Sequence, residues 1–210
     1  MLFRIALFLT ACFLISCRTT ARVAVSQPMP PRWEKTPECE KASGFVRIDI
    51  SLASKTAQLL SKDGVLLAEM DVSPGVPGHE TPKGHFRVTE KLTLKRSNLY
   101  GQYVKKDTKE VVVHRAWEHQ GPAPEGTEYQ GIAMPWWLRL TDDGVGIHVG
   151  GFERGQPTSH GCIRCLEEAQ KVFYDKAEVG TLVCIHEGQH PAPSLLNAEG
   201  AEADKSMKRR

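Results

Sequence analysis

Short stretches of alternating apolar and polar residues fill the middle of the chain, separated by steps rich in glycine and proline. Alternation with a period of two is typical of a half-buried β-strand, and Asp63-Gly64 is a frequent kind of hairpin turn. The pattern therefore predicts strands over residues 45–52, 56–73 (two strands around the turn), 84–92, 110–117, 136–141, 145–150 and 180–188.

One segment has the periodicity of a helix instead. Within residues 163–177, apolar side chains recur at i, i+3, i+6 and i+7, and therefore share one helical face: Leu166, Ala169, Val172 and Phe173. Many short strands with one principal helix predict a mainly β fold, a β-sandwich or a barrel-like sheet. A doubly wound parallel sheet is disfavoured.

The N-terminus differs from this middle part. After Arg4, residues 5–15 form a near-unbroken apolar run, which is too short to span a bilayer and has the layout of a signal peptide. The run ends in Leu-Ile-Ser-Cys at residues 14–17, which resembles the lipobox of bacterial lipoproteins. In that family the peptide is cut before the cysteine, which is then acylated. Our first interpretation is lipidation of Cys17; ordinary export and an uncleaved anchor are the alternatives.

These patterns divide the chain into four parts. Residues 1–16 are the predicted signal peptide, 17–43 a polar, proline-bearing tether, 44–187 the folded domain and 188–210 a disordered tail. Every interpretation of the N-terminus places the domain outside the cytoplasm. The lipoprotein interpretation anchors it in the periplasm or on the outer face of the cytoplasmic membrane. A formal net charge of +2 gives no indication of nucleic-acid binding.

The richest chemistry lies in the stretch "GQPTSHGCIRCLEE", residues 155–168. Cys162 stands at the start of the predicted helix, where unpaired N–H groups and the helix dipole favour a thiolate. Gly161 permits a tight turn, so that successive N–H groups can converge on an oxyanion. His148 closes the apolar strand before this loop and is the candidate base. The composition suits nucleophilic catalysis by a Cys–His pair.

Other chemistry remains open from the residues alone. Cys162 and Cys165 form a C-x-x-C pair, as in thiol oxidoreductases, although no βαβ pattern surrounds it. A zinc site from His148, His160, Cys162 and Cys165 is a further alternative, although its spacing fits no common structural zinc pattern. The exported part also contains Cys39 and Cys184, and the sequence does not settle which cysteines pair; Cys165–Cys184 is one candidate bridge.

The motif "GIHVGG…PTSHGCIR" resembles the signature of the L,D-transpeptidase catalytic domain (YkuD-like) family, a strand histidine followed by Ser/Thr-His-Gly-Cys. Two further stretches are similar to the family: "TPKGHF" at residues 81–86 and the Met-Pro-aromatic stretch that begins at Met134. The resemblance covers roughly residues 45–187. At position 165 the family usually has an aliphatic residue, so Cys165 departs from it.

The resemblance implies a β-sandwich with the cysteine at its open end, and it implies roles for individual residues. Cys162 is the nucleophile, His148 the base, and the carbonyl of Val149 orients His148. The N–H groups of His160, Gly161 and Cys162 line the oxyanion hole. Ser159 and Arg164 shape the site, and Arg164 is a candidate partner for a substrate carboxylate. Neither a metal nor a cofactor is needed.

The implied substrates are the stem peptides of peptidoglycan. The implied reaction cleaves the bond between meso-diaminopimelate and the terminal D-alanine of a tetrapeptide stem and forms a 3→3 cross-link. An L,D-carboxypeptidase or a protein-to-wall transferase would use the same site. An inactive, lipid-anchored wall-binding module is the non-enzymatic alternative. Trp136 and Trp137 are expected to pack in the core and at the rim rather than to bind the stem.

Overall fold

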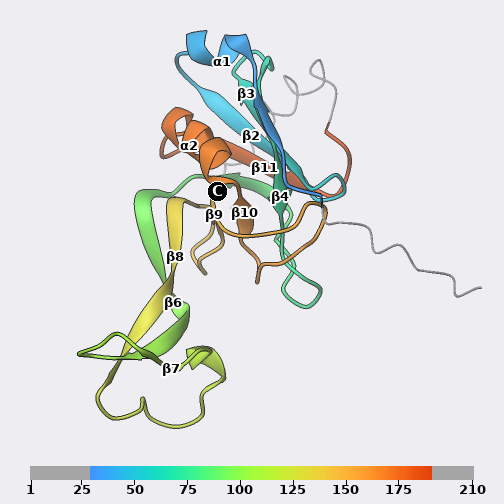
Figure 1. Ribbon diagram of the computed structural model, residues 1–210. Helices are drawn as coiled ribbons and strands as arrows, with labels where there is room; N and C mark the ends of the chain where they lie inside the picture. The colour runs from blue at the N-terminus through green and yellow to red at the C-terminus, as the bar shows by residue number, and fades with distance from the viewer. Residues whose placement is uncertain (1–28, 191–210) are drawn as a thin grey trace, which may run out of the picture.

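The computed structural model describes residues 29–190, which form eleven strands, two α-helices and one short 3-10 helix (Figure 1). The predicted signal peptide with Cys17, and the tail from residue 191, lie outside the described residues. The elements are β1 (Trp33–Lys35), α1 (Pro37–Lys41), β2 (Val46–Ser51), β3 (Thr56–Ser61), β4 (Leu66–Ser73), β5 (Gly84–Arg87), β6 (Glu90–Lys105), β7 (Val111–Val113), the 3-10 helix (Ala116–Glu118), β8 (Thr127–Arg139), β9 (Gly146–Val149), β10 (Ile163–Cys165), α2 (Glu167–Lys176) and β11 (Leu182–His186). No helix between residues 29 and 190 combines the length and the apolar character needed to cross a membrane.

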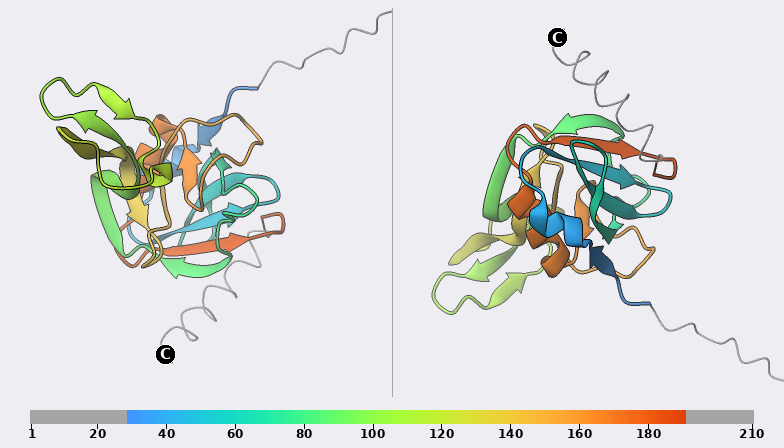
Figure 2. Two further views of the ribbon diagram at one scale, coloured as in Figure 1. Left: turned by 90° about the horizontal axis from the view of Figure 1, so that it is seen from below. Right: turned by 90° about the horizontal axis from the view of Figure 1, so that it is seen from above.

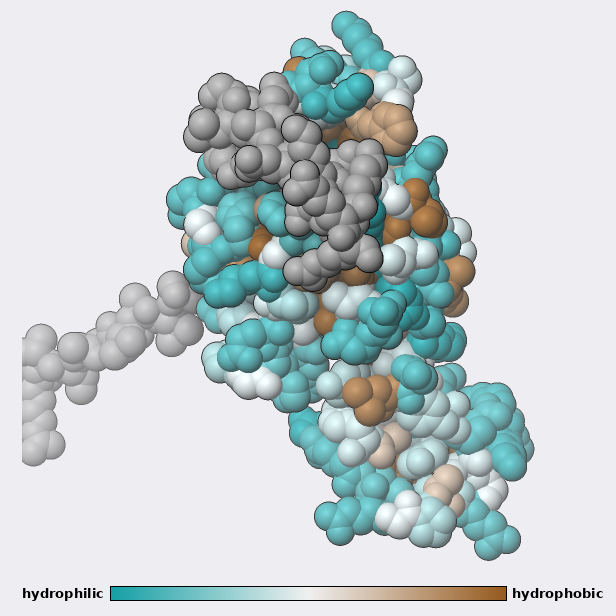
Figure 3. All heavy atoms as spheres, turned by 180° about the vertical axis from the view of Figure 1, so that it is seen from behind, coloured by the Kyte–Doolittle hydropathy of each residue, from teal (hydrophilic) through white to brown (hydrophobic). Residues whose placement is uncertain are grey.

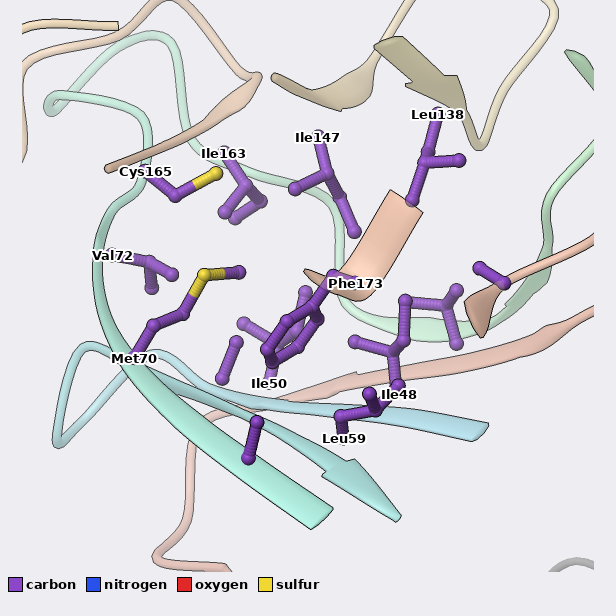
Figure 4. Close-up of a cluster of buried hydrophobic side chains, with 14 of the residues drawn as sticks. Ile48, Ile50, Leu59, Met70, Val72, Leu138, Ile147, Ile163, Cys165 and Phe173 are labelled. Carbon is purple, nitrogen blue, oxygen red and sulfur yellow. The ribbon is translucent and has the colours of Figure 1, made fainter. Parts of the chain in front are cut away.

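All eleven strands belong to one sheet, with the order β5-β11-β2-β3-β4-β10-β9-β8-β6-β7 and with β1 paired to β4. Strand β4 pairs with β3 at one end and with β10 at the other, so it joins the two halves of the sheet. Side chains from both halves meet in a single core: Figure 4 shows Ile48, Leu59 and Met70 of one half beside Leu138, Ile147 and Ile163 of the other. The predicted mainly β, sandwich-like fold with one principal helix is confirmed.

Helix α2 buries its apolar face against this core. Ala169 and Phe173 have no exposed surface, and the Phe173 ring lies at the centre of the cluster in Figure 4. The predicted start of the helix is wrong, because residues 163–165 form strand β10 and the helix begins only at Glu167. Strand β10 pairs with β9 and with β4, so two ladders of hydrogen bonds hold these residues extended.

The predicted tether and tail both reach into the folded domain. Strand β1 pairs with β4, and the Thr36 hydroxyl shares its hydrogen between two carbonyls at the start of β4. Helix α1 buries Cys39, which is only 1% exposed. The tether expected over residues 17–43 is therefore wrong for residues 33–41, because they cover the core. At the other end, His190 contacts the buried side chain of Asp49, so residues 188–190 are part of the domain as well.

Strands β6 and β8 form a long hairpin that projects from the body of the domain, with β7 at its far end (Figures 1 and 2). The predicted strands over residues 84–92, 110–117 and 136–141 found only parts of it. Most side chains of β6 are exposed or half-buried. Apolar and polar residues alternate poorly along this strand, so the sequence pattern that indicates a strand is weak there. On the face drawn in Figure 3, the surface is largely hydrophilic, with apolar residues scattered among polar ones.

Candidate active site

Strands β9 and β10 bring the two candidate catalytic side chains to one cavity. The strands run parallel, with Ile163 opposite Ile147 and Arg164 opposite His148, and Cys162 directly precedes β10. A cavity of about 350 Å³ is lined by five of the side chains singled out from the sequence, together with residues of the projecting hairpin. The five are His148, Ser159, His160, Cys162 and Arg164.

The turn before Cys162 is fixed from both sides. The buried Ser159 hydroxyl donates a hydrogen bond to the Cys162 carbonyl. The Thr81 hydroxyl donates to the Gly161 carbonyl over 2.9 Å and accepts from the Gly75 N–H, also over 2.9 Å. Gly161 has φ +108°, a conformation that side-chain-bearing residues rarely adopt. The Thr-Pro stretch at residue 81 therefore serves the site by holding this turn.

The same hydrogen bonds orient a candidate oxyanion donor. Every peptide bond between residues 29 and 190 is trans, so the C=O and N–H of one peptide unit point in opposite directions. Because the Gly161 carbonyl points at the buried Thr81, the Cys162 N–H points away from Thr81. This N–H is held in a fixed direction beside the thiol, which is the arrangement that an oxyanion hole requires.

His148 is poised as a neutral base. Its Nδ1 lies 2.8 Å from the Val149 carbonyl, which can only accept, so Nδ1 carries the hydrogen and Nε2 keeps its lone pair. The side chain is buried, and burial lowers the pKa of His148 to about 4. The Val149 hydrogen bond raises this pKa in part, and the Arg164 charge lowers it further. The imidazole is therefore neutral at neutral pH and can take a proton.

Cys162 is protonated in the resting state. Burial raises its pKa, while a hydrogen bond from Gly146 and the charge of Arg164 act in the opposite direction. The thiol sulfur lies 3.7 Å from the Gly144 carbonyl. Activation by a helix N-terminus, as expected from the sequence, is wrong: α2 begins at Glu167, beyond β10. The thiol must instead lose its proton to a neighbouring base as it reacts.

Cys165 has a different environment, although it is only three residues away. It has no exposed surface, and its sulfur lies 3.2 Å from the His148 carbonyl and 3.3 Å from Oε1 of Gln170, two acceptors that share its single S–H. Burial raises the pKa of Cys165 far above its usual range. Its sulfur points into the core in Figure 4.

The alternatives that used both cysteines are not supported. Cys39, Cys162 and Cys165 are free thiols, so neither a Cys162–Cys165 nor a Cys165–Cys184 bridge is formed. Cys165 lies in the core cluster rather than in the cavity, so it cannot join His148 and Cys162 around a zinc ion. The C-x-x-C spacing therefore spans the two faces of one strand.

Arg164 places a positive charge at the cavity. Its side chain lies over Gly150, where an added Cβ would come within 2.9 Å of the arginine's Cγ and Cδ atoms. The absence of a side chain at Gly150 therefore makes room for the guanidinium. A guanidinium nitrogen also lies 3.4 Å from the Thr158 hydroxyl. The arginine is in place to bind an anionic group of a substrate.

The projecting hairpin completes the cavity with residues that the sequence did not reveal. The His160 ring packs between those of His79 and Tyr100, with centroid distances of 4.4 and 4.8 Å, and Trp117 packs edge-on against Tyr100 at 5.4 Å. The hairpin and its 3-10 helix supply seven lining residues: Ser97, Tyr100, Arg115, Trp117, Glu118, Ile132 and Met134. Met134 belongs to the Met-Pro stretch, but the others carry no local motif. They reach the site only through the pairing of β6 with β7 and β8.

The tandem tryptophans pack as expected. Trp137 is 1% exposed, and its indole N–H donates to Glu90 over 2.8 Å. Trp136 is half-buried at the rim, where its ring meets Tyr174 edge-on at 5.2 Å. Neither residue lines the cavity.

Solved structures share this fold. An L,D-transpeptidase from Mycobacterium smegmatis is 20% identical, with a TM-score of 0.50, covering 67% of this chain and 58% of that one. L,D-transpeptidase 3 from Mycobacterium tuberculosis is 19% identical, with a TM-score of 0.50 and coverage of 68% and 61%. The LD transpeptidase LdtMt1 in complex with imipenem is 19% identical, with a TM-score of 0.50 and coverage of 67% and 58%. This chain thus spans less than two thirds of the length of these structures.

A comparison with curated proteins found no match. The family model of the L,D-transpeptidase catalytic domain matches residues 46–185. That range is two thirds of the chain and includes β2, β9, β10, all but the last residue of β11, and the turn that carries Cys162. The chain belongs to the L,D-transpeptidase catalytic domain family.

Proposed function

We propose that this chain is a cysteine L,D-transpeptidase that acts on peptidoglycan stem peptides. One observation carries the proposal: a neutral, buried His148 and a protonated Cys162 line the same cavity, with Arg164 beside them. A base and a nucleophile that are both uncharged at rest can exchange a proton as the bond to the substrate forms. Family membership supports the choice of an amide of the stem as the substrate.

The acylation step begins with proton transfer from the Cys162 thiol to Nε2 of His148. The sulfur attacks the carbonyl that joins meso-diaminopimelate to the terminal D-alanine. The N–H of Cys162, with those of His160 and Gly161, stabilises the oxyanion that develops. His148 then donates its proton to the nitrogen of D-alanine, which leaves as an amine, and the donor stem remains on Cys162 as a thioester.

The second step transfers the stem to an acceptor. The side-chain amine of a second stem attacks the thioester, and its proton goes to His148. The collapse of the intermediate returns Cys162 as a thiol, because the proton passes from His148 to the sulfur. The product is a 3→3 cross-link. Water in place of the amine would give a tripeptide, which is the L,D-carboxypeptidase outcome.

Arg164 is the proposed contact for a carboxylate of the stem. Its side chain lines the cavity, and Arg164 pairs with His148, the candidate base, where β10 runs beside β9. A bidentate arginine–carboxylate contact fixes both the position and the orientation of a substrate. Tyr100 and Trp117 offer an apolar wall on the hairpin side of the same cavity.

We also propose that the protein is exported and anchored by lipid on Cys17, in the periplasm or on the outer face of the cytoplasmic membrane. The support is the apolar run of residues 5–15 followed by Leu-Ile-Ser-Cys. Mass spectrometry of the mature protein tests this proposal. We expect an acylated cysteine as the first residue; an unmodified N-terminus elsewhere would contradict it.

The reaction is tested with purified protein and disaccharide-tetrapeptides under reducing conditions. We expect release of D-alanine and a 3→3 dimer, identified by mass and by fragmentation. A carbapenem is a second probe, because the imipenem complex of a protein with this fold suggests that the strained carbonyl is accepted. A single covalent adduct on Cys162 is expected. Tetrapeptide that stays intact, or an adduct that survives loss of Cys162, would rule out the mechanism.

A further inference from the structure

A second group of chemistry-bearing side chains lies outside the active-site cavity, where β2 meets β11. Asp49 is on β2 and is 3% exposed. The parallel ladder places Cys184 opposite Asp49 and His186 opposite Ser51, so His186 is one step diagonal to Asp49 on the neighbouring strand. His190 follows four residues later, just beyond the end of β11. The two strands lie side by side in Figure 1.

The three side chains converge on one point. Oδ1 of Asp49 lies 2.9 Å from Nε2 of His186 and 2.5 Å from Nδ1 of His190. One oxygen or nitrogen from each residue lies within 4.8 Å of the other two. Among the residues that the structure describes, this is the group of three that has the spacing of a metal site.

We propose that Asp49, His186 and His190 bind a divalent transition-metal ion, with Zn²⁺ the best match. Two imidazoles and one carboxylate are a ligand set that zinc accepts at about 2.0–2.2 Å, and three protein ligands leave a position for water. The Asp49 carboxylate has one negative charge, so it would neutralise half of the charge of a divalent ion at this largely buried site. The ion would take the place of the two hydrogen bonds between the histidines and Asp49. It would bind one nitrogen of each histidine and an oxygen of Asp49 instead.

Side chains around the three residues already make hydrogen bonds that would orient the ligands of such a site. Nε2 of His190 lies 2.7 Å from the Thr56 hydroxyl. With the metal on Nδ1, the hydrogen of His190 moves to Nε2 and donates to this hydroxyl, as ligating histidines commonly require. The Ser51 hydroxyl donates over 2.6 Å to the carbonyl of Gly188, in the loop between the two histidines. The loop is thus held in place independently of any ion.

This site is separate from the catalytic one. None of its three residues lines the cavity of Cys162 and His148. The ion would instead tie β2, β11 and the segment up to residue 190 together. Strand β11 also pairs with β5, and so the ion would stabilise the edge of the sheet that follows the Thr81 stretch.

The test uses the full chain without a polyhistidine tag, in the Cys162→Ala background, so that the catalytic thiol cannot bind the probe. The probe is Zn²⁺ alone, titrated in competition with a chromogenic chelator. We expect one zinc per chain and a higher midpoint of thermal unfolding with zinc than without it. Co²⁺ should give visible absorption bands without the intense near-ultraviolet band of a thiolate ligand.

Three variants locate the ion. His190→Ala should abolish tight binding and the thermal shift. Thr56→Val retains all three ligands and should weaken binding by about 10- to 100-fold, the usual effect of losing a partner of a ligating histidine. The control is His119→Ala, since His119 lies in the projecting hairpin and contacts the Pro122 carbonyl. It should bind zinc as the background does.

Circular dichroism without metal establishes which variants are folded. If His190→Ala does not fold, Thr56→Val and the cobalt spectrum decide the question. The proposal is overturned if the folded background protein takes up no zinc, or if His190→Ala binds it as tightly as the background. A near-ultraviolet cobalt band from a thiolate would overturn it as well, because this ligand set has no sulfur.

Discussion

The two faces of β10 place two nearby cysteines, Cys162 and Cys165, in very different environments. Cys162 stands at the head of the strand, on the side of the cavity that Arg164 also faces, while Ile163 and Cys165 face the core. Both cysteines are free thiols, and burial raises the pKa of each. Cys162, however, shares its cavity with a neutral imidazole and a guanidinium, whereas Cys165 is enclosed by core side chains and donates to carbonyl oxygens.

The comparison teaches that a low pKa is not what distinguishes the candidate nucleophile here. Reactivity requires a base within the same cavity, access for a substrate and donors for the oxyanion. Cys162 has these features, and Cys165 has none of them. A thiol with a raised pKa is also a stronger nucleophile once it is deprotonated, so a base that acts only during attack suits this site.

The largest expected effect separates the two thiols directly. Cys162→Ala should abolish D-alanine release and carbapenem acylation, because no other side chain in the cavity can form the thioester. Cys165→Ala should retain most of both activities, since its sulfur lies in the core. The measurement is intact mass after carbapenem treatment, together with D-alanine release. Equal losses in two folded variants would show that both thiols act in the reaction.

Removal of the base should have the next largest effect. His148→Ala should slow carbapenem acylation of Cys162 by about 10²- to 10⁴-fold, the usual contribution of a positioned base. His119→Ala is a suitable control, because His119 contacts the Pro122 carbonyl in the projecting hairpin and does not line the cavity. The time course of adduct formation gives both rates. A rate in His148→Ala near that of the wild type would mean that another group accepts the proton.

The turn before the thiol should matter less than the base. Gly161→Ala forces a side chain onto a residue at φ +108° and displaces the neighbouring N–H groups, although the nearest atom to the new Cβ would be 3.6 Å away. Loss of one oxyanion donor costs about 2.7–4 kcal/mol, so acylation should slow by about 10²- to 10³-fold.

Gly155 provides a matched control for that substitution. It also has a positive φ, +76°, and nothing within 4 Å of an added Cβ, but it does not line the cavity. Gly155→Ala therefore introduces similar backbone strain without moving the donors. Its acylation rate should stay close to that of the wild type. If both alanine variants slow the reaction equally, general strain of the loop and not the oxyanion donors would be the cause.

The smallest effect is on stability, through the burial of His148. The pKa of His148 falls from 6.5 to about 4 on folding, so the unfolded state binds more protons between these values. The free energy of unfolding that depends on a neutral His148 is fully present above pH 6.5 and is lost as the pH falls through 4. The whole loss is about 3 kcal/mol. Denaturant unfolding of the wild type and His148→Gln at pH 7 and pH 4 measures it. The loss between these pH values should be smaller in the variant, and parallel losses would contradict the assignment.

The sequence predicted the parts of the fold that have strong local signals. Strand β2 alternates apolar and polar residues, and an Asp-Gly turn joins β3 to β4, so the pattern predicts all three strands nearly to the residue. The sequence predicts a helix over residues 163–177, because the helical periodicity that begins at Leu166 carries no signal that separates residues 163–165 from it. Only pairing with β9 and β4, which are distant in the sequence, makes them a strand.

The site was predicted where it depends on a motif and missed where it depends on topology. Ser159, His160 and Cys162 stand together in the sequence, and His148 ends a recognisable strand. Tyr100 and Trp117, in contrast, come from a polar hairpin whose strands have little apolar alternation. The predicted activation of the Cys162 thiol by a helix dipole is also wrong. It required a helix that starts at Cys162, whereas α2 begins five residues later, at Glu167.

The hydrogen bond from Thr81 to Gly161 has a consequence for when the candidate active site forms. It joins residues 80 positions apart, and the neighbouring bond from Ser73 to the Gln156 carbonyl spans 83 positions. Contacts between distant segments form slowly, because the chain must first lose the entropy of closing a long loop. The turn that carries Cys162 is therefore complete only after these loops have closed. Until then, Cys162 lacks the base and the oxyanion donor proposed for it, so the proposed acylation requires that β9, β10 and the Thr81 stretch have come together.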